Sequence, residues 1–255
     1  MISINALLIT GAGLLALPAA ATPSFRNPGT LAGWDNILRE HSGTVDEVTN
    51  VVYAGNTAIK VTQTYDPNYT GRYHAEVHRG TGYKRGETGF YGFAFRLSDT
   101  WEFSPAQSYN IGQFIADFGD TGCDDWMPSS MVWLYGDQLY SRVKYGSICD
   151  QHITTYPNIA TVTRGAWHRV EIQASWQSDS TGYYKIWFDG VKVLEKYNIQ
   201  TTIDDSREFE WHMGLYANGW HDDGGMKGTQ GFRQVWYDNL AIGTTFADAD
   251  PAQFS

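Results

Sequence analysis

The sequence has little cysteine and no excess of positive charge. Its 255 residues include two cysteines, and 18 Lys and Arg stand against 28 Asp and Glu, which gives a formal net charge of −10. A protein with this balance does not bind nucleic acid or an anionic membrane over a broad surface, although a cleft can still be locally basic. The 42% of hydrophobic residues, with 15% of the chain aromatic, exclude a disordered chain.

The first 21 residues carry no charge at all. An apolar run from Ala6 to Leu17 is followed by Pro18 and three alanines. A short apolar core before small residues is typical of a secretory signal peptide, and the run is short for the alternative, a membrane anchor. We therefore expect residues 1–21 to be a signal peptide, the protein to be secreted, and residues 22–255 to form one domain with no membrane-spanning segment.

The expected secretion of the protein bears on the state of its two cysteines. Cys123 and Cys149 form an even pair in a chain expected to be secreted, and this predicts a disulfide bond. Two free buried thiols are the alternative.

Sustained helical spacing of apolar residues is absent, and short alternating runs recur instead. Gly136-Asp137 and Asp189-Gly190 each join two such runs and predict hairpins, because these pairs supply the positive φ that tight turns need. Further runs predict strands at Gly89–Leu97, His168–Ser175, Phe209–Tyr216 and Gln234–Ile242. About a dozen strands and no helix indicate an all-β sandwich of two antiparallel sheets, a jelly roll with a concave groove.

One predicted strand carries an unusual polar face. Because side chains alternate along a strand, His74, Glu76 and His78 share one face, opposite to Tyr73 and Arg79. Such a row is either an exposed polar face or the floor of a wet groove. A zinc site is a further alternative, although the row is flat and no helical HExxH motif supports it.

Two more strands have polar residues in apolar surroundings. Gln113 and Asp117 are expected to share a strand face with Tyr109, Ile111 and Ile115, so Gln113 is either a structural hydrogen-bond hub or a site residue. In the third strand, His212, Gly214 and Tyr216 share a face, and Gly214 leaves an open space between its two neighbours unless it marks a bulge or a close approach. The three strands are candidates for one concave sheet.

These motifs resemble those of jelly-roll polysaccharide lyases, and most closely polysaccharide lyase family 20, the fungal glucuronan lyases. Alginate lyases of this fold carry R-x-E-L-R, Q-I-H and Y-F-K-A-G-x-Y. Here His74–His78 keeps the central Glu, Gln113–Ile115 keeps the Gln, and Glu210–Tyr216 keeps G-x-Y with His212 at the Lys position. The changes fit a family that acts on another uronate.

The resemblance implies β-elimination on a uronic acid polymer. The C6 carboxylate must be neutralised, a base must remove the C5 proton, and an acid must protonate the leaving O4. In β-1,4-glucuronan both events occur on one side of the ring, so one group can serve both. We predict Tyr216 as this acid and base, and Gln113 with His74 as the groups that neutralise the carboxylate.

The remaining predicted contacts bind an acidic polysaccharide. The substrate-binding candidates are His212, His78, Arg79, Arg142, Lys144 and Trp220. Arg142 and Lys144 share a strand face and are equally well explained as solvated surface charges. Trp220 is predicted as a stacking platform, with a core or rim position as the alternative, as for Trp126.

The resemblance also implies a structural calcium ion, for which Asp238 is the candidate ligand and the Asp222–Gly225 loop the alternative. We expect a monomer. Two other functions remain open. The first is a sugar-binding jelly roll without catalysis. The second is a glycoside hydrolase, for which Glu76 and Asp117 are the conceivable carboxylate pair, although the E-x-D-x-x-E signature of jelly-roll glucanases is absent.

Overall fold

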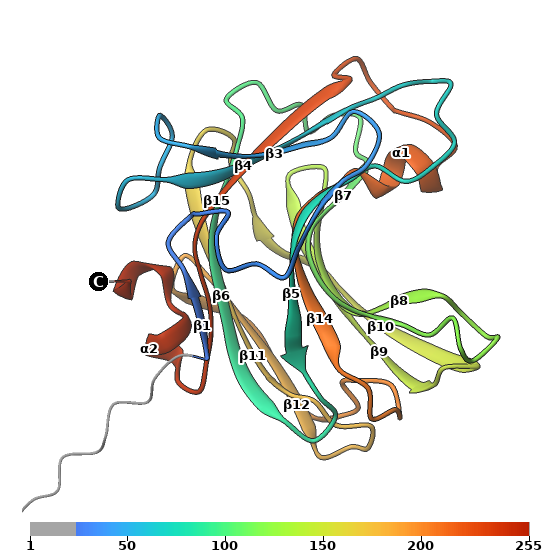
Figure 1. Ribbon diagram of the computed structural model, residues 1–255. Helices are drawn as coiled ribbons and strands as arrows, with labels where there is room; N and C mark the ends of the chain where they lie inside the picture. The colour runs from blue at the N-terminus through green and yellow to red at the C-terminus, as the bar shows by residue number, and fades with distance from the viewer. Residues whose placement is uncertain (1–23, 255) are drawn as a thin grey trace, which may run out of the picture.

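Two antiparallel β-sheets pack face to face in the computed structural model, which describes residues 24–254 (Figure 1). One sheet has eight strands, in the order β13-β12-β11-β6-β15-β4-β3 with β1 paired to β15, and the other has seven, in the order β10-β9-β8-β7-β14-β5-β2. The predicted all-β sandwich is therefore confirmed. The predicted signal peptide, residues 1–21, lies outside the described residues.

The eight-stranded sheet consists of β1 (Phe25–Asn27), β3 (Thr44–Val48), β4 (Ala58–Thr64), β6 (Thr88–Leu97), β11 (Trp167–Ser175), β12 (Gly182–Phe188), β13 (Val191–Ile199) and β15 (Phe232–Gly243). The seven-stranded sheet consists of β2 (Asn36–Arg39), β5 (His74–Tyr83), β7 (Ser108–Asp117), β8 (Trp126–Tyr135), β9 (Gln138–Ser147), β10 (Asp150–Thr161) and β14 (Phe209–Tyr216).

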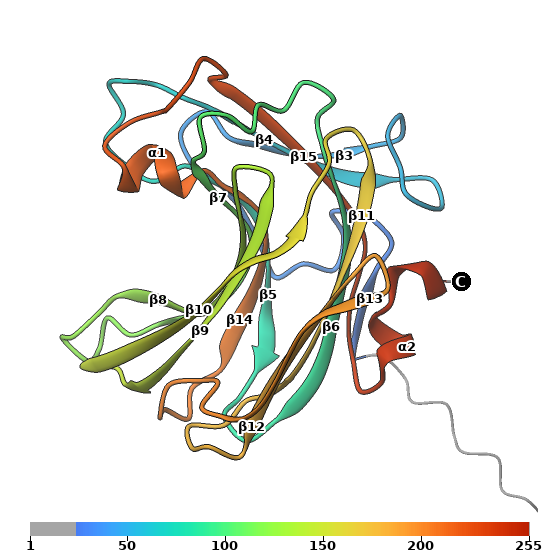
Figure 2. The same cartoon turned by 180° about the vertical axis from the view of Figure 1, so that it is seen from behind.

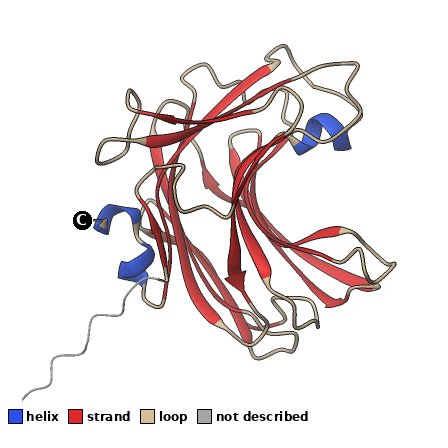
Figure 3. Ribbon diagram, viewed as in Figure 1, coloured by secondary structure: helices blue, strands red, loops and turns tan. Residues whose placement is uncertain are grey.

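Within residues 24–254, helix is confined to three short segments, which the sequence pattern did not predict (Figure 3). These are α1 (Asn218–Asp222), which directly follows β14, α2 (Phe246–Ala249) and the 3₁₀ turn η1 (Pro251–Gln253). Each is too short to show a helical repeat. None of the helices in residues 24–254 is long and apolar enough to cross a membrane.

Both predicted hairpins are present with the expected turns. Asp189 and Gly190 join β12 to β13 with φ values of 51° and 80°, the positive pair that a type I′ turn requires. Gly136 joins β8 to β9 with a φ of 62°. The local turn chemistry therefore fixes which strands pair at these two points.

Aromatic side chains fill the space between the sheets. Tyr83 stacks on Trp176 and on Phe209, with ring centroids 3.9 Å and 4.7 Å away. In both views the seven-stranded sheet curves away from the eight-stranded sheet, so its concave face stays open (Figures 1 and 2). The inward-facing residues build the core, and the outward face of the curved sheet is left for polar residues.

The predicted disulfide joins Cys123 to Cys149. It ties the connection between β7 and β8 to the turn between β9 and β10. Closing a loop with a sequence separation of 26 stabilises the fold by roughly 3–4 kcal/mol in the chain-entropy model. The bond therefore holds together the far edge of the concave sheet.

The outer face of the eight-stranded sheet buries a carboxyl group without hydrogen-bond partners. Glu171 on β11 lies opposite Gly92, whose α-carbon faces the carbonyl group of Ala249 in α2. Neither carboxylate oxygen of Glu171 has a hydrogen-bond partner among the described residues. Burial, and next the nearby charge of Asp250, raise the pKa of Glu171 to about 8.

This carboxyl group predicts that stability falls between pH 4.5 and about pH 8. Its pKa is about 8 in the folded protein against 4.5 for a free group, so in this range the folded state keeps a proton that the unfolded state releases. The stabilisation is complete below pH 4.5, is lost progressively as the pH rises to about 8, and falls no further above that pH. Glu171→Gln should flatten this decline and raise the melting temperature above pH 8, measured by thermal unfolding. The surface variant Glu208→Gln should keep the wild-type slope, and parallel slopes for all three proteins would contradict the assignment.

Candidate active site

The concave face of the seven-stranded sheet forms a groove of about 1310 Å³. The predicted catalytic and binding residues that line it are His74, His78, Gln113, Arg142, Lys144, His212 and Tyr216. They come from β5, β7, β9 and β14. Residues up to 142 positions apart in the chain are therefore gathered on one surface, as the three polar strand faces predicted.

The pairing register aligns these side chains across the sheet. β14 lies between β5 and β7, and His212 stands opposite both His78 and Gln113. Four residues further along β14, Tyr216 stands opposite His74. Because successive side chains alternate between faces, the same register sends Met213 and Leu215 into the core.

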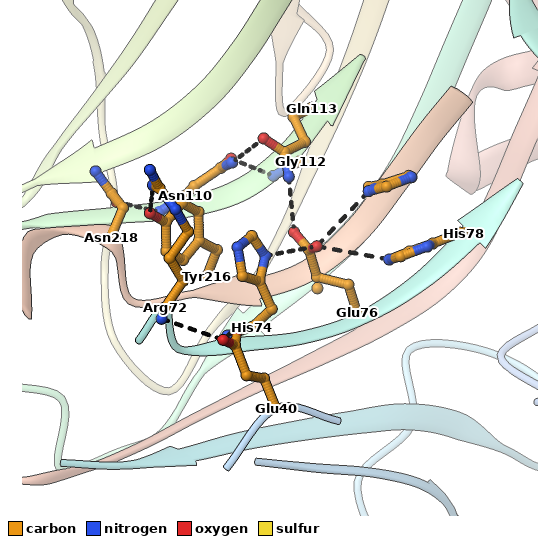
Figure 4. Close-up of polar contacts among 12 residues, drawn as sticks. Glu40, Arg72, His74, Glu76, His78, Asn110, Gly112, Gln113, Tyr216 and Asn218 are labelled. Carbon is orange, nitrogen blue, oxygen red and sulfur yellow. Dashed lines mark hydrogen bonds and ion pairs between the residues drawn. The ribbon is translucent and has the colours of Figure 1, made fainter. Parts of the chain in front are cut away.

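The carboxylate of Glu76 is the hub of the groove floor (Figure 4). Its Oε2 lies 2.9 Å from Nδ1 of His74, 3.6 Å from Nε2 of His78 and 3.7 Å from Nδ1 of His212. Its Oε1 accepts a hydrogen bond of 3.1 Å from Nε2 of Gln113. Glu76 itself is only 1% exposed, so these four side chains take the place of water around it.

The surroundings keep this buried carboxylate ionised. Burial alone would raise the pKa of Glu76, but the charge of His74 and the contacts of the three histidines hold it well below 4.5. Burial alone would lower the pKa of His212, because it disfavours the charged imidazole. The carboxylates of Glu210 and Glu76 outweigh this effect and raise the pKa of His212. Glu210 lies 2.8 Å from Nε2 of His212. The floor therefore combines the negative charge of Glu76 with His212, an imidazole whose pKa is raised.

A bulge in β7 sets the orientation of Gln113. The register against β8 shifts between Asn110 and Gly112, so Ile111 is an extra residue that reverses the alternation. The prediction that Gln113 shares a face with Tyr109 and Ile111 is therefore wrong, since both of these lie in the core. The bulge instead puts Asn110 beside Gln113, whose Oε1 accepts a 2.9 Å hydrogen bond from Nδ2 of Asn110.

Tyr216 is held by a residue that the sequence did not reveal. Nη1 of Arg72 donates a hydrogen bond of 2.6 Å to the Tyr216 hydroxyl, and the ring of His74 stacks on Tyr216 with centroids 3.8 Å apart. Asp222 lies 3.9 Å from Nη1 of Arg72. Burial and then Asp222 raise the pKa of Tyr216 to about 12, and Arg72 opposes them. Arg72 precedes β5 in a loop, where no periodicity points to it.

Gly214 does not leave the open space that its position predicted. An ideal Cβ there would overlap the carbonyl oxygen of Ala75 and lie 2.6 Å from the α-carbon of Glu76. The residue has a φ of 153° and allows β5 to approach β14 closely. Gly214 therefore allows the backbone at Glu76 to pack closely against β14. This is the close approach that was the alternative explanation for a glycine at this position.

The end of the groove on β9 is basic. Nζ of Lys144 donates a 2.9 Å hydrogen bond to Gln151, and burial together with Arg142 lowers the pKa of Lys144 to about 8. Nε of Arg142 is buried and has no hydrogen-bond partner among the described residues. Both side chains line the groove, so they are not merely solvated surface charges.

Two predicted binding residues lie elsewhere. Arg79 does not line the groove, because it alternates with His78 along β5, and its guanidinium pairs at 2.9 Å with Asp35, a residue of the groove rim. Trp220 is 2% exposed and packs edge-on against Tyr73, so it is a core residue and not a stacking platform. A tryptophan that does line the groove is Trp126, which is 50% exposed.

The carboxylate pair of the hydrolase alternative is not assembled. Asp117 does not line the groove, whereas Glu76 is buried in its floor. The low pKa of Glu76 is also unsuited to a general acid, which has to hold a proton at neutral pH.

Two arrangements are suited to a metal ion. In the groove, Glu76, His78 and His212 bring one ligand atom each within 4.8 Å of one another. Away from the groove, the carboxylate of Asp238 is fully buried and accepts hydrogen bonds from the backbone of Tyr53, Ala54 and Asn239.

The surroundings of Asp238 fit the calcium ion that the family resemblance implies. An ideal Cβ on Gly29 would lie 2.8 Å from Oδ1 of Asp238 and would overlap the carbonyl oxygen of Thr57. The carboxylate of Asp238 and the carbonyl oxygen of Thr57 therefore lie close together beside Gly29, and oxygen is the ligand atom that calcium prefers. The Asp222–Gly225 loop, the alternative calcium site, has other partners. Asp222 faces Arg72, and Asp223 binds Lys227 at 2.8 Å.

Comparison with known proteins identifies the family of the chain. A polysaccharide lyase family model matches residues 26–241. The crystal structure of an endo-β-1,4-glucuronan lyase from the fungus Trichoderma reesei is 61% identical, with a TM-score of 0.90. The match covers 91% of this chain and 100% of that chain. No curated protein matches the chain in sequence.

More distant structures share the fold alone. A marine PL-14 alginate lyase from Aplysia kurodai is 9% identical over 88% of this chain and 100% of its own, with a TM-score of 0.59. The cellulose-induced protein Cip1 is 16% identical over 81% of this chain and 88% of its own, with a TM-score of 0.53. The predicted jelly roll and the family resemblance are both confirmed, and the chain belongs to the polysaccharide lyase family.

Proposed function

We propose that the protein is a secreted lyase that cleaves β-1,4-linked polyglucuronate by β-elimination. The observation that carries the substrate is the 61% identity, over 91% of this chain, to an enzyme described as an endo-β-1,4-glucuronan lyase. The groove supports the proposal, since it joins a tyrosine, a glutamine and several imidazoles on one open surface. Arg72, Arg142 and Lys144 line the groove and supply the positive charge that binds an acidic polysaccharide.

Gln113 and His74 neutralise the C6 carboxylate of the uronate at the cleavage point. One amide hydrogen of Gln113 is committed to Glu76, and its carbonyl oxygen accepts from Asn110, so the second amide hydrogen remains for the substrate. His74 uses Nδ1 for Glu76, which leaves Nε2 for the same task. Withdrawing charge from the carboxylate makes the C5 proton more acidic.

Tyr216 transfers the proton. Its phenolate takes the proton from C5, the electron pair forms the C4–C5 double bond, the C4–O4 bond breaks, and the resulting phenol returns the proton to O4. With a pKa of about 12, forming the phenolate costs about 7 kcal/mol at pH 7. Arg72 reduces this cost through its 2.6 Å hydrogen bond, and the same high pKa makes the phenolate a strong base.

Neighbouring uronates bind along the rest of the groove. Arg142 and Lys144 supply positive charge on β9, and His78 with His212 supplies further donors on the floor. Trp126 offers an exposed ring against which a sugar can stack, with its centroid 6.1 Å from that of His212. Residues 1–21 as a signal peptide, residues 22–255 as one domain and a monomeric state complete the proposal.

Calcium is proposed as a structural ion, held by Asp238 and the carbonyl group of Thr57. It would neutralise a buried carboxylate that has no cationic partner within 4 Å among residues 24–254. It would thereby stabilise β15 against the preceding loops without taking part in catalysis.

The substrate is tested directly with the purified protein. Incubation with β-1,4-glucuronan should raise the ultraviolet absorbance as the unsaturated uronate forms, while alginate and pectate should give slower or no change. New reducing ends without absorbance would indicate hydrolysis instead. Retention on immobilised glucuronan without any product would indicate a binding protein.

Removing one oxygen atom tests the role of Tyr216. Tyr216→Phe should lower kcat by at least roughly a hundredfold, because the proton has no carrier, while the affinity for glucuronan survives. Tyr135→Phe, which changes an exposed tyrosine outside the groove, is the matched control and should keep full activity. Turnover of Tyr216→Phe near the wild-type rate would refute the assignment.

Thermal unfolding tests the calcium site separately from activity. A chelator should lower the melting temperature by several degrees, and calcium should restore it more effectively than magnesium, because magnesium gives up its water ligands reluctantly. Asp238→Asn should abolish this response, whereas Asp223→Asn in the acidic loop should retain it. A melting temperature that no chelator changes would count against a bound ion.

A further inference from the structure

We infer that Glu76, His78 and His212 form a binding site for a transition metal ion of the zinc class on the groove floor. The cluster is separate from the oxygen-lined space at Asp238, and no step of the proposed β-elimination uses it. Its ligand atoms are Oε2 of Glu76, Nε2 of His78 and Nδ1 of His212. Two imidazoles and one carboxylate form a donor set that binds zinc in sites with three protein ligands.

The distances suit a tetrahedral ion. Ligand atoms about 2.1 Å from zinc lie about 3.4 Å from one another. The two nitrogens lie 3.6 Å and 3.7 Å from the carboxylate oxygen, within a few tenths of an ångström of that spacing. The rings of His78 and His212 are stacked in parallel with centroids 3.4 Å apart, so both rings must rotate out of this stack before their nitrogens point at one ion.

One of these nitrogens makes no hydrogen bond in the described part of the protein. Nε2 of His78 is buried and has no hydrogen-bond partner among residues 24–254, although the side chain is only 8% exposed. A polar atom in this situation lacks the partner that burial normally demands. The nitrogen faces Glu76 and the groove, which is where an ion would sit.

The second ring nitrogen of His212 is positioned as in metal centres, since Nε2 lies 2.8 Å from the carboxylate of Glu210. Such an outer partner fixes the orientation of a ligating imidazole and increases its basicity. Nδ1 of His78 lies 3.2 Å from the amide nitrogen of Asn36, which is a donor, so Nε2 can bind an ion only when Asn36 turns its amide oxygen toward Nδ1. The remaining coordination position opens into the groove.

The donor set decides which ions bind. Imidazole nitrogens favour zinc, nickel and copper over calcium and magnesium, which prefer oxygen. Calcium can consequently be present at Asp238 without competing for the groove. The ion would lie four residues along β14 from Tyr216, beside the position proposed for the reacting uronate.

Zinc binding to the untagged protein tests the inference without any activity assay. The protein is stripped with a chelator, returned to excess calcium, and titrated with zinc by calorimetry. One equivalent should bind, and cobalt should give the intense visible absorption of a tetrahedral site. His78→Gln and His212→Gln should each weaken zinc at least tenfold, whereas His152→Gln, which removes an exposed histidine outside the groove, should match the wild type.

A fourth variant separates ligand loss from misfolding. Glu210→Gln keeps all three ligands and alters a partly exposed carboxylate, and it should lower the zinc affinity by about 10–100-fold at unchanged stoichiometry. The inference is overturned if the wild type binds no zinc at micromolar concentration. It is equally overturned if folded His78→Gln and His212→Gln proteins bind zinc as tightly as the wild type.

Discussion

A buried carboxylate cannot remain charged unless donors replace the water it has lost, and Glu76 imposes this requirement on the whole groove. Its two oxygens are met by His74, His78, His212 and Gln113, which come from three adjacent strands. A carboxylate left without these partners would cost several kcal/mol. The positions of the residues proposed to handle the substrate therefore follow from the need to solvate one charge.

The sheet brings donors to Glu76 through the way its strands pair, and not through an excess of polar residues. β14 runs between β5 and β7, and Gly214 lets β14 approach the backbone at Glu76. The bulge at Ile111 turns Gln113 toward the carboxylate and places Asn110 behind it. Each feature removes a side chain or inserts a residue, so each changes where neighbouring groups point while the rest of the ladder continues.

Sequence patterns were informative wherever a local rule governs the structure. Alternation identified the shared face of His74, Glu76 and His78, and the Asp189-Gly190 pair identified a hairpin, because both depend only on adjacent residues. Arg72 was missed since it reaches Tyr216 from a loop, a contact between residues 144 positions apart. The shared face assigned to Gln113 failed for a related reason, because a bulge is visible only against the partner strand.

Trp220 and Arg79 show a second limit of pattern reading. Proximity to Tyr216 in the sequence suggested that Trp220 reaches the groove, yet α1 turns its ring into the core against Tyr73. Alternation correctly placed Arg79 off the face of His78, and no twist of β5 brings the Arg79 side chain into the lining of the groove. Burial of a large aromatic surface and pairing with Asp35 decide both cases, and neither can be read from one strand.

The two buried glutamates show how neighbours decide the chemistry of the same group. Glu76 is surrounded by imidazoles and an amide, so its pKa falls and the groove keeps a permanent charge. Glu171 is equally inaccessible but faces Asp250 and no hydrogen-bond donor, so its pKa rises and it holds a proton at neutral pH. A charge that persists through the working pH range can orient histidines and bind cations, whereas a protonated acid can do neither. The functional face of this sandwich is accordingly the one in which polar residues from several strands meet in register, because only such a meeting provides enough donors to keep a buried acid ionised.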